Sequence, residues 1–166
     1  MRVLGIDCGT EYTGYGVVEL RDDTSLLCLD CGAIKLSTRT PMSARLAIIF
    51  DRLSALIAAH QPENVAIEDV FYALNVKSAL KLGQVRGVAM LAASVAGLVV
   101  AEYAPLTIKS AVVGYGRAEK AQVQLMVARL LRLEQIPEPP DAADALAIAI
   151  CHLHTSATLQ RQAMAT

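Results

Sequence analysis

The sequence predicts an α/β protein, with a mixed five-stranded sheet and helices on both of its faces. Three strand-like segments come first and are separated by short turns, which predicts an antiparallel meander. Helical and strand-like segments then alternate, which predicts strands joined by helical crossovers. With 166 residues, 54% of them hydrophobic, the chain is long enough to form one well-packed domain over residues 1–166.

The strands are predicted where short apolar runs lie between turn-forming residues. They cover residues 2–8, 14–20, 25–36, 64–71 and 98–103. Because the fourth strand follows a helix, we expect it to run parallel to a neighbour in the sheet. The first strand is its natural neighbour.

The helices are predicted where apolar residues recur at helical spacing, with prolines near several of the boundaries. They cover residues 41–60, 77–97, 106–113, 118–133 and 141–155, and Pro105 precedes the third of them. Residues from about 156 to 166 are expected to form a loosely ordered tail.

The sequence favours a cytoplasmic protein with no membrane partner. Its longest apolar run, residues 88–101, is too short to cross a bilayer. A charged residue, Asp7, lies where a signal peptide would need its apolar region.

Four cysteines are present, and Cys28 and Cys31 have the CxxC spacing of some redox and zinc sites. No second such pair exists, and both residues lie in a strand-like run. We therefore interpret Cys8, Cys28, Cys31 and Cys151 as reduced, buried thiols, with a redox or zinc role as the less favoured alternative.

The net charge of −1 hides a strongly uneven distribution. Residues 73–133 contain eight basic and two acidic side chains, whereas the rest of the chain contains seven basic and fourteen acidic ones. A basic region of this kind is typical of a protein that binds a polyanion such as DNA. Ordinary solvation of helix surfaces explains the same charges equally well.

Four acidic residues are placed where a site can form. Asp7 and Glu68 lie near the carboxyl ends of the first and fourth predicted strands, where α/β sheets bind their ligands. Asp141 and Asp144 are three residues apart, on one face of the last predicted helix. Each has a simpler interpretation alone. Asp141 and Asp144 can cap a helix or occupy its first turn, Asp7 can be a hydrogen-bonded turn residue, and Glu68 can be an acid of an edge strand.

Together the four acids predict a metal site if the first and fourth strands pair beneath the last helix. Two carboxylates 4 Å apart repel by about 4 kcal/mol at an effective dielectric constant near 20. Cations must offset that repulsion, and oxygen ligands favour hard ions such as Mg²⁺ or Mn²⁺. Two such ions can promote in-line attack on a phosphodiester.

Four stretches of the sequence closely resemble the RuvC family of bacterial Holliday-junction resolvases. They are GIDCGTEYTGYGVV, AIEDVFYALNVKSALKLGQVRG, VVGYGRAEKAQV and PDAADALAIAICH, which lie in the family's order and spacing from residue 2 to about residue 155. The resemblance implies an RNase H-like fold and a homodimer. It also implies symmetric nicking of four-way DNA junctions in recombination and repair, with two Mg²⁺ ions per site or Mn²⁺ as a substitute, alongside the RuvA and RuvB proteins.

The resemblance assigns roles to individual residues. The family's catalytic, metal-binding acids match Asp7, Glu68, Asp141 and Asp144. Phe71 matches an aromatic residue that inserts near the crossover, and Lys109 and Lys120 match basic residues near the scissile phosphate. Cys8 replaces a common proline, and Leu74 replaces a lysine of many members. The second departure removes an expected phosphate contact, so the affinity or sequence preference for DNA is expected to differ.

Further DNA contacts are expected from the residue types alone. Lys77 and Lys81 lie one helical turn apart and can follow backbone phosphates, although plain solvation is an equal alternative. Either Phe71 or Tyr72 can stack on an unpaired base while the other joins the core. The helix predicted over residues 77–97 also carries small apolar residues that can pack on the sheet or on a second copy of the chain. They are Val85, Val88, Ala89, Ala92 and Val95.

Two other functions remain as alternatives. Residues 7–10 also resemble the first phosphate motif of actin-like ATPases and sugar kinases, but those proteins need two such domains around the nucleotide. A non-catalytic junction-binding protein, with its acids serving as caps and turn residues, is the second alternative.

Overall fold

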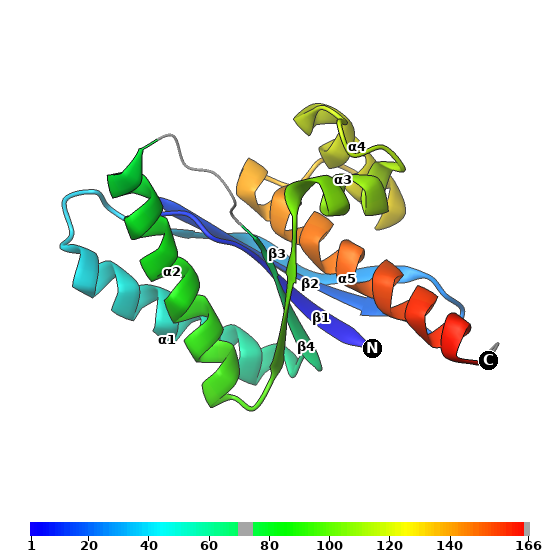
Figure 1. The fold of residues 1–166 in the computed structure, drawn as a ribbon, viewed down its shortest axis with the longest axis horizontal. Helices are drawn as coiled ribbons and strands as arrows, with labels where there is room; N and C mark the ends of the chain where they lie inside the picture. Colours follow the sequence, from blue (N-terminus) through cyan, green and yellow to red (C-terminus); the bar gives the residue numbers. More distant parts are fainter. Residues whose placement is uncertain (70–74, 165–166) are drawn as a thin grey trace.

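The computed structural model describes residues 1–69 and 75–164, the last six of these by their backbone only. Its centre is one five-stranded sheet in the order β3-β2-β1-β4-β5 (Figure 1). The strands are β1 (Arg2–Asp7), β2 (Tyr12–Leu20), β3 (Leu26–Lys35), β4 (Asn64–Glu68) and β5 (Val99–Tyr103). The first three strands pair antiparallel, whereas β4 runs parallel to both β1 and β5. The predicted meander and the predicted pairing of the first and fourth strands are both confirmed.

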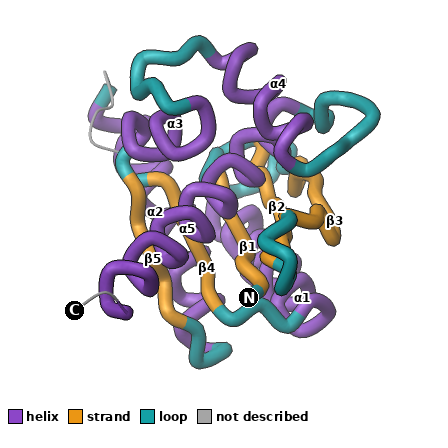
Figure 2. Tube along the Cα trace, turned by 90° about the vertical axis from the view of Figure 1, so that its right-hand side faces the viewer, coloured by secondary structure: helices purple, strands orange, loops and turns teal. Residues whose placement is uncertain are grey.

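Five helices cover the two faces of this sheet, as predicted. They are α1 (Met42–His60), α2 (Val76–Val95), α3 (Pro105–Val113), α4 (Lys120–Leu130) and α5 (Pro140–Met164). Figure 2 shows α1 and α2 on one side of the strands and α5 on the other, with α3 and α4 beside α5. Each face therefore has its own apolar core.

The alternation of side chains along β1 divides its residues between the two cores. Val3 packs with α3, α4 and α5, whereas Leu4 and Ile6 pack with α1 and α2. All three are fully buried, and each such burial contributes about 1.5–3 kcal/mol. A central strand covered on both faces explains why the sequence here is almost continuously apolar.

Three glycines allow α5 to lie unusually close to β1 and β2. A Cβ atom added at Gly5 would stand 2.1 Å from the backbone oxygen of Ala145, and one at Gly14 would stand 2.1 Å from that of Asp141. At Gly16 it would stand 2.7 Å from a methyl carbon of Leu146. No side chain fits beneath the helix at these positions, so the glycines bring the amino end of α5 down onto the strands.

Replacing Gly14 with alanine is expected to lower the free energy of unfolding by about 1–3 kcal/mol, the usual cost of forcing extra volume into a packed core. Urea denaturation measures this change. Gly87→Ala in α2 is the control, because a Cβ atom there meets nothing within 4 Å. An unchanged midpoint for Gly14→Ala would contradict the close packing of α5.

Several predicted boundaries differ from the structure by one to three residues, and the end of the last helix differs by more. The strand predicted to reach residue 71 ends at Glu68, and residues 70–74 lie outside the described part of the chain. The helix end predicted near residue 155, with a loosely ordered tail after it, is corrected because α5 continues to Met164. The segment after Thr155 contains no glycine or proline to stop a helix, and its leucine, glutamines, arginine and alanines favour one.

All four cysteines are free, but only Cys151 is buried, so the prediction of buried thiols is wrong for Cys8, Cys28 and Cys31. These three are partly exposed. Among the described helices, none has the length and apolar character needed to span a membrane.

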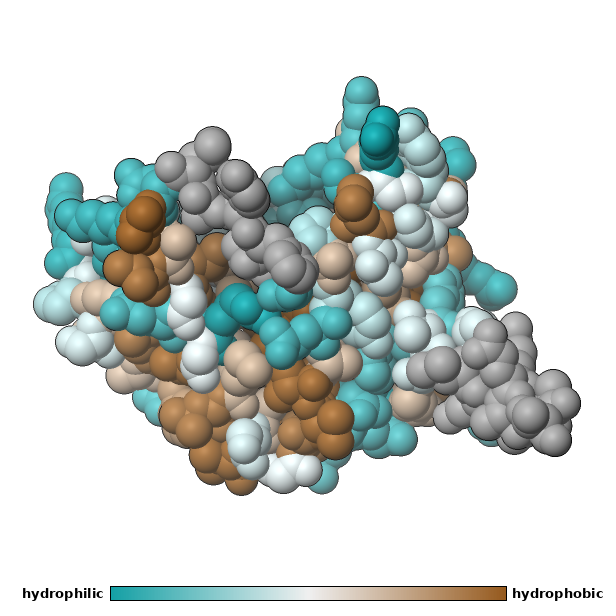
Figure 3. Space-filling model, viewed as in Figure 1, coloured by the Kyte–Doolittle hydropathy of each residue, from teal (hydrophilic) through white to brown (hydrophobic). Residues whose placement is uncertain are grey.

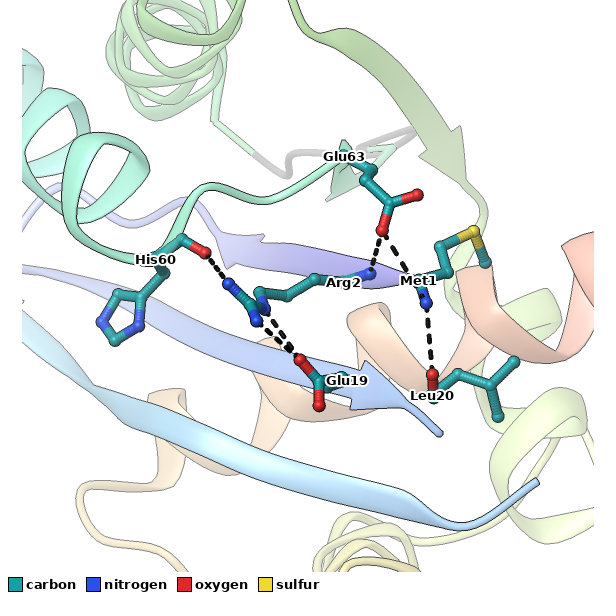
Figure 4. Close-up of polar contacts among 6 residues, drawn as sticks. All are labelled: Met1, Arg2, Glu19, Leu20, His60 and Glu63. Atoms are coloured by element: carbon teal, nitrogen blue, oxygen red, sulfur yellow. Dashed lines mark hydrogen bonds and ion pairs between the residues drawn. The ribbon is translucent and has the colours of Figure 1, made fainter. Parts of the chain in front are cut away.

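Polar contacts join the strands at the end of the sheet opposite Asp7 (Figure 4). Arg2 donates through Nε and Nη2 to Glu19 Oε2, at 3.0 and 2.7 Å, across the β1–β2 pair. The backbone nitrogen of Arg2 donates to Glu63 Oε1 at 3.0 Å, just before β4. These contacts link β1 to both of its neighbours and help to set the register that positions its other end.

Candidate active site

The carboxyl ends of β1 and β4 meet at one edge of the sheet. Asp7 is the last residue of β1 and Glu68 is the last residue of β4. Because Ile6 pairs with Ile67 in the parallel register, the two acids lie side by side. The first turns of α5 carry Asp141 and Asp144 toward the same edge, as the glycine packing requires.

A pocket of about 200 Å³ opens at this edge. Its polar lining is made of three acids and two lysines: Asp7, Glu68, Asp144, Lys109 and Lys120. Its apolar wall comes from α3, α4 and α5 and consists of Pro105, Ile108, Val123, Ala147 and Ile148. Three of the four predicted acids and both of these predicted lysines therefore share one cavity, although they come from five separate elements of the chain.

Asp7 has the most perturbed carboxyl group of the pocket. Burial, together with the negative charges of Asp144, Glu68 and Asp141, raises its pKa to about 7, against the lowering effect of Lys120. Burial and the charge of Asp144 also raise the pKa of Glu68, against the lowering effect of Lys109. Carboxylates whose ionisation is this unfavourable are stabilised strongly by a bound cation.

Lys120 supplies one of the positive charges directly. Its Nζ atom lies 2.6 Å from Asp144 Oδ2, and this hydrogen bond raises the pKa of the lysine. Lys120 is the first residue of α4, where Glu119 and Gln122 form a reciprocal capping box. The cap fixes the start of α4, so the lysine is presented to the pocket by an ordered helix end.

Asp141 lies less centrally than the other three acids. It belongs to the first turn of α5, inside the helix rather than at the predicted capping position. Its charge acts on Asp7, but its side chain is not part of the pocket lining. Within the described residues, no three carboxylate, thiol or imidazole groups are close enough together to hold a metal ion as they stand. The carboxylate oxygens of these acids are suitable ligands for a hard cation. The acids lie too far apart to bind one together in this structure, so they would have to move closer around the ion.

The chain matches the family model of "Crossover junction endodeoxyribonuclease RuvC" over residues 3–152. It belongs to the RuvC family.

Individual RuvC proteins support this membership over nearly the whole chain. Crossover junction endodeoxyribonuclease RuvC of Koribacter versatilis is 68% identical, with 97% of each chain covered. Thermus thermophilus RuvC is similar in structure, with a TM-score of 0.88 at 35% identity over 95% of this chain and 96% of that one. The same protein in complex with a Holliday junction substrate also gives a TM-score of 0.88, at 33% identity and the same coverage. The chain is therefore an enzyme of this endodeoxyribonuclease family, and its RNase H-like fold is confirmed.

The other residues predicted to contact DNA lie away from the pocket or outside the described residues. Lys77 and Lys81 are exposed on α2 and are not part of the pocket lining. Phe71 and Tyr72 fall within residues 70–74, which the structure does not describe. Their proposed contacts with DNA remain predictions.

Two arginines support this edge of the sheet, and neither was predicted from the sequence to do so. Arg86 of α2 places Nη1 3.3 Å from Asp69 Oδ1 and also pairs with Glu102 of β5, so it fixes the residue that follows Glu68. Arg45 of α1 is buried and donates from Nη1 to the backbone oxygen of Thr10 at 2.9 Å, beside the turn after Asp7. Their only signal in the sequence is a basic residue within a largely apolar helical segment.

Proposed function

We propose that this chain resolves four-way (Holliday) DNA junctions by nicking two strands symmetrically, in homologous recombination and DNA repair. The products are a 5′-phosphate and a 3′-hydroxyl, which a ligase can rejoin. One observation carries the proposal: the acids from β1, β4 and α5 share a pocket with lysines from α3 and α4. Membership of the RuvC family and the solved junction complex of the Thermus thermophilus relative support the choice of substrate.

The acids of this pocket are proposed to hold two Mg²⁺ ions, which Mn²⁺ can replace. Asp7, Glu68, Asp141 and Asp144 provide oxygen donors of the kind these ions prefer. When bound, such ions supply a nucleophilic water and stabilise charge on the phosphate. The high pKa of Asp7 means that its carboxyl must release its proton before it can act as a ligand.

Lys109 and Lys120 are proposed to orient the scissile phosphate. Both line the pocket, from α3 and α4, and a lysine meets a phosphate as a compact positive charge. Lys120 is held by Asp144 in the structure, so it must exchange that carboxylate for a phosphate oxygen when DNA binds. The apolar wall formed by Ile108 and Ile148 restricts water beside the reacting group.

A cleavage assay on a synthetic four-way junction tests the proposed function. With Mg²⁺ we expect paired nicks at symmetric positions in opposing strands, with little cutting of matched linear duplex. Binding without nicking would favour the non-catalytic alternative. Calorimetry with ATP tests the actin-like alternative, which micromolar binding would support.

A homodimer is proposed on the basis of the outer face of α2. The stripe named in the sequence splits in the structure, because Val85, Ala89 and Ala92 are buried against the sheet while Val95 is 70% exposed. A second stripe of exposed residues runs along the helix and consists of Val76, Leu80, Leu91 and Val95. Figure 3 shows hydrophobic surface over both ends of α2. Gly83 and Gly87 lie between these ends with open space above them, which allows a second helix to approach closely.

Leu91→Glu is expected to convert a dimer into monomers, because it places a charge in that apolar stripe. Leu91 is 54% exposed, so the monomer itself should remain folded. Ile48→Glu on α1, where the side chain is 42% exposed, is the matched control. Sedimentation equilibrium distinguishes the outcomes: a monomeric wild-type chain, or equal dissociation of both variants, contradicts the assignment.

From the family resemblance, we propose that the chain acts together with the RuvA and RuvB proteins. We also propose that it is located in the cytoplasm. RuvA and RuvB move the branch point, so a junction nuclease in the same complex would cut where migration brings its preferred sequence. A pull-down of purified RuvA and RuvB on junction DNA, with and without this chain, tests the association.

A further inference from the structure

A β-bulge in β3 brings the two cysteines of the CxxC sequence to the same face of the sheet. In a regular strand, residues three apart point to opposite faces. Here the register shifts between Val17 and Val18, so Leu29 is inserted without a partner of its own. Cys28 and Cys31 consequently both pack against the core beneath α5, while Leu29 packs against the core on the α1 side.

The bulge also shortens the distance between the two cysteines. Cys28 lies opposite Val18 and Cys31 lies opposite Gly16, two positions apart along β2. Two strand residues span about 7 Å, close to the Cα separation of about 4.4–6.8 Å that disulfides tolerate. Because β3 is at the edge of the sheet, it has a strand on one side only and can adjust more easily than a central strand.

The two thiols are chemically unequal. A hydrogen bond with Cys28 lowers the pKa of Cys31 to about 7, and the same contact raises the pKa of Cys28. The lowered pKa favours the thiolate of Cys31, which is the reactive form, beside the protonated thiol of Cys28. The other cysteines contrast with this pair, because burial raises the pKa of Cys8 to about 12 and that of Cys151 to about 11.

We propose that Cys28 and Cys31 form a dithiol that hydrogen peroxide oxidises to a reversible disulfide within β3. The Cys31 thiolate attacks the O–O bond, which breaks to give a sulfenic acid and hydroxide. The Cys28 thiol then attacks the sulfenic sulfur, and the S–S bond forms as hydroxide leaves with the thiol proton as water. The first hydroxide takes up a proton, so one peroxide and two thiols give one disulfide and two waters.

This site is separate from the proposed nuclease centre. Neither cysteine lines the acidic pocket. Zinc binding is the less suitable role for the pair, because no third cysteine, histidine or acid joins it as a ligand within residues 1–69 and 75–164.

Peptide mapping tests the proposal directly. The folded wild-type protein is treated with stoichiometric hydrogen peroxide, alkylated under denaturing conditions and digested with trypsin. Residues 22–35 form one tryptic peptide that contains both cysteines, whereas Cys8 and Cys151 fall in other peptides. We expect this peptide to lose two hydrogen atoms and to escape alkylation, and dithiothreitol to reverse the change.

Single variants separate the roles of the two thiols. Cys28→Ser should leave a sulfenic acid on Cys31 that dimedone traps, whereas Cys31→Ser should give no adduct at Cys28. Cys8→Ser is the matched control and should oxidise as the wild type does. In the unoxidised wild type, iodoacetamide should modify Cys31 several-fold faster than Cys28.

Two results would overturn the proposal. One is a peptide 22–35 that keeps both thiols free when peroxide has oxidised other cysteines. The other is a disulfide that joins two chains instead of closing within the peptide. Because the mapping uses the wild-type protein, it decides the matter even if a serine variant fails to fold.

Discussion

Asp7→Asn is expected to reduce junction cleavage by at least about a thousandfold while leaving junction binding nearly unchanged. Asparagine has almost the same shape as aspartate, but its amide is a much poorer ligand for Mg²⁺. Losing several kcal/mol of charge stabilisation in the transition state corresponds to a rate loss of this size. Binding should persist because Lys109 and Lys120 line the same pocket and are unaltered.

The measurement pairs single-turnover nicking in Mg²⁺ with a gel-shift titration of the same junction in Ca²⁺. Asp51→Asn serves as the control, because Asp51 is an exposed acid on α1 and lies outside the pocket. It should cut and bind as the wild type does. If Asp7→Asn still nicks at a comparable rate, Asp7 is not a metal ligand of the reaction.

The same substitution is expected to stabilise the metal-free protein by about 4 kcal/mol above pH 7. The pKa of Asp7 is about 7 in the folded chain, against about 3.9 in an unfolded one. The folded state therefore binds the proton more tightly, so this group lowers stability as the pH rises from about 4 to about 7. Its contribution is constant above that range, and each unit of pKa difference corresponds to about 1.4 kcal/mol.

Urea denaturation in EDTA from pH 4 to pH 9 tests this prediction. The difference in unfolding free energy between Asp7→Asn and wild type should grow through the range from pH 4 to pH 7 and then level off. Asp51→Asn should show no such dependence. A difference that stays flat across the whole range would mean that the raised pKa of Asp7 has been assigned to the wrong group.

Much of the fold could be predicted because apolar periodicity and turn residues are local signals. The end of α3 at Val113 and the end of β2 at Leu20 were predicted to the residue. The bulge at Leu29 could not be predicted, because an unpartnered residue is defined only by the register of the neighbouring strand. The continuation of α5 to Met164 was missed because its sequence lacks a clear stop signal and its last turns lack the earlier apolar pattern.

The acids were easier to predict than the residues that hold them in place. Asp7 and Glu68 end strands that were predicted to pair, so topology alone placed them together. The position of Asp144 depends on how closely α5 packs against the sheet. In the sequence, Gly14 and Gly16 were the residues that could have indicated this close packing. Arg86, on helix α2, was not predicted as a supporting residue because its partner Glu102 lies on another element, strand β5, sixteen positions further along the chain.

The position of β1 in the middle of the sheet has a consequence for local opening. Its amides are bonded on both sides and its faces are covered by α1 and α5, so they should exchange with solvent deuterium only when the whole domain unfolds. Lys77 and Lys81, on the exposed start of α2, should lie near amides that exchange much sooner. The proposed metal ligand Asp7 would then sit on the slowest-exchanging backbone, and the proposed DNA contacts Lys77 and Lys81 on a helix end that opens more readily.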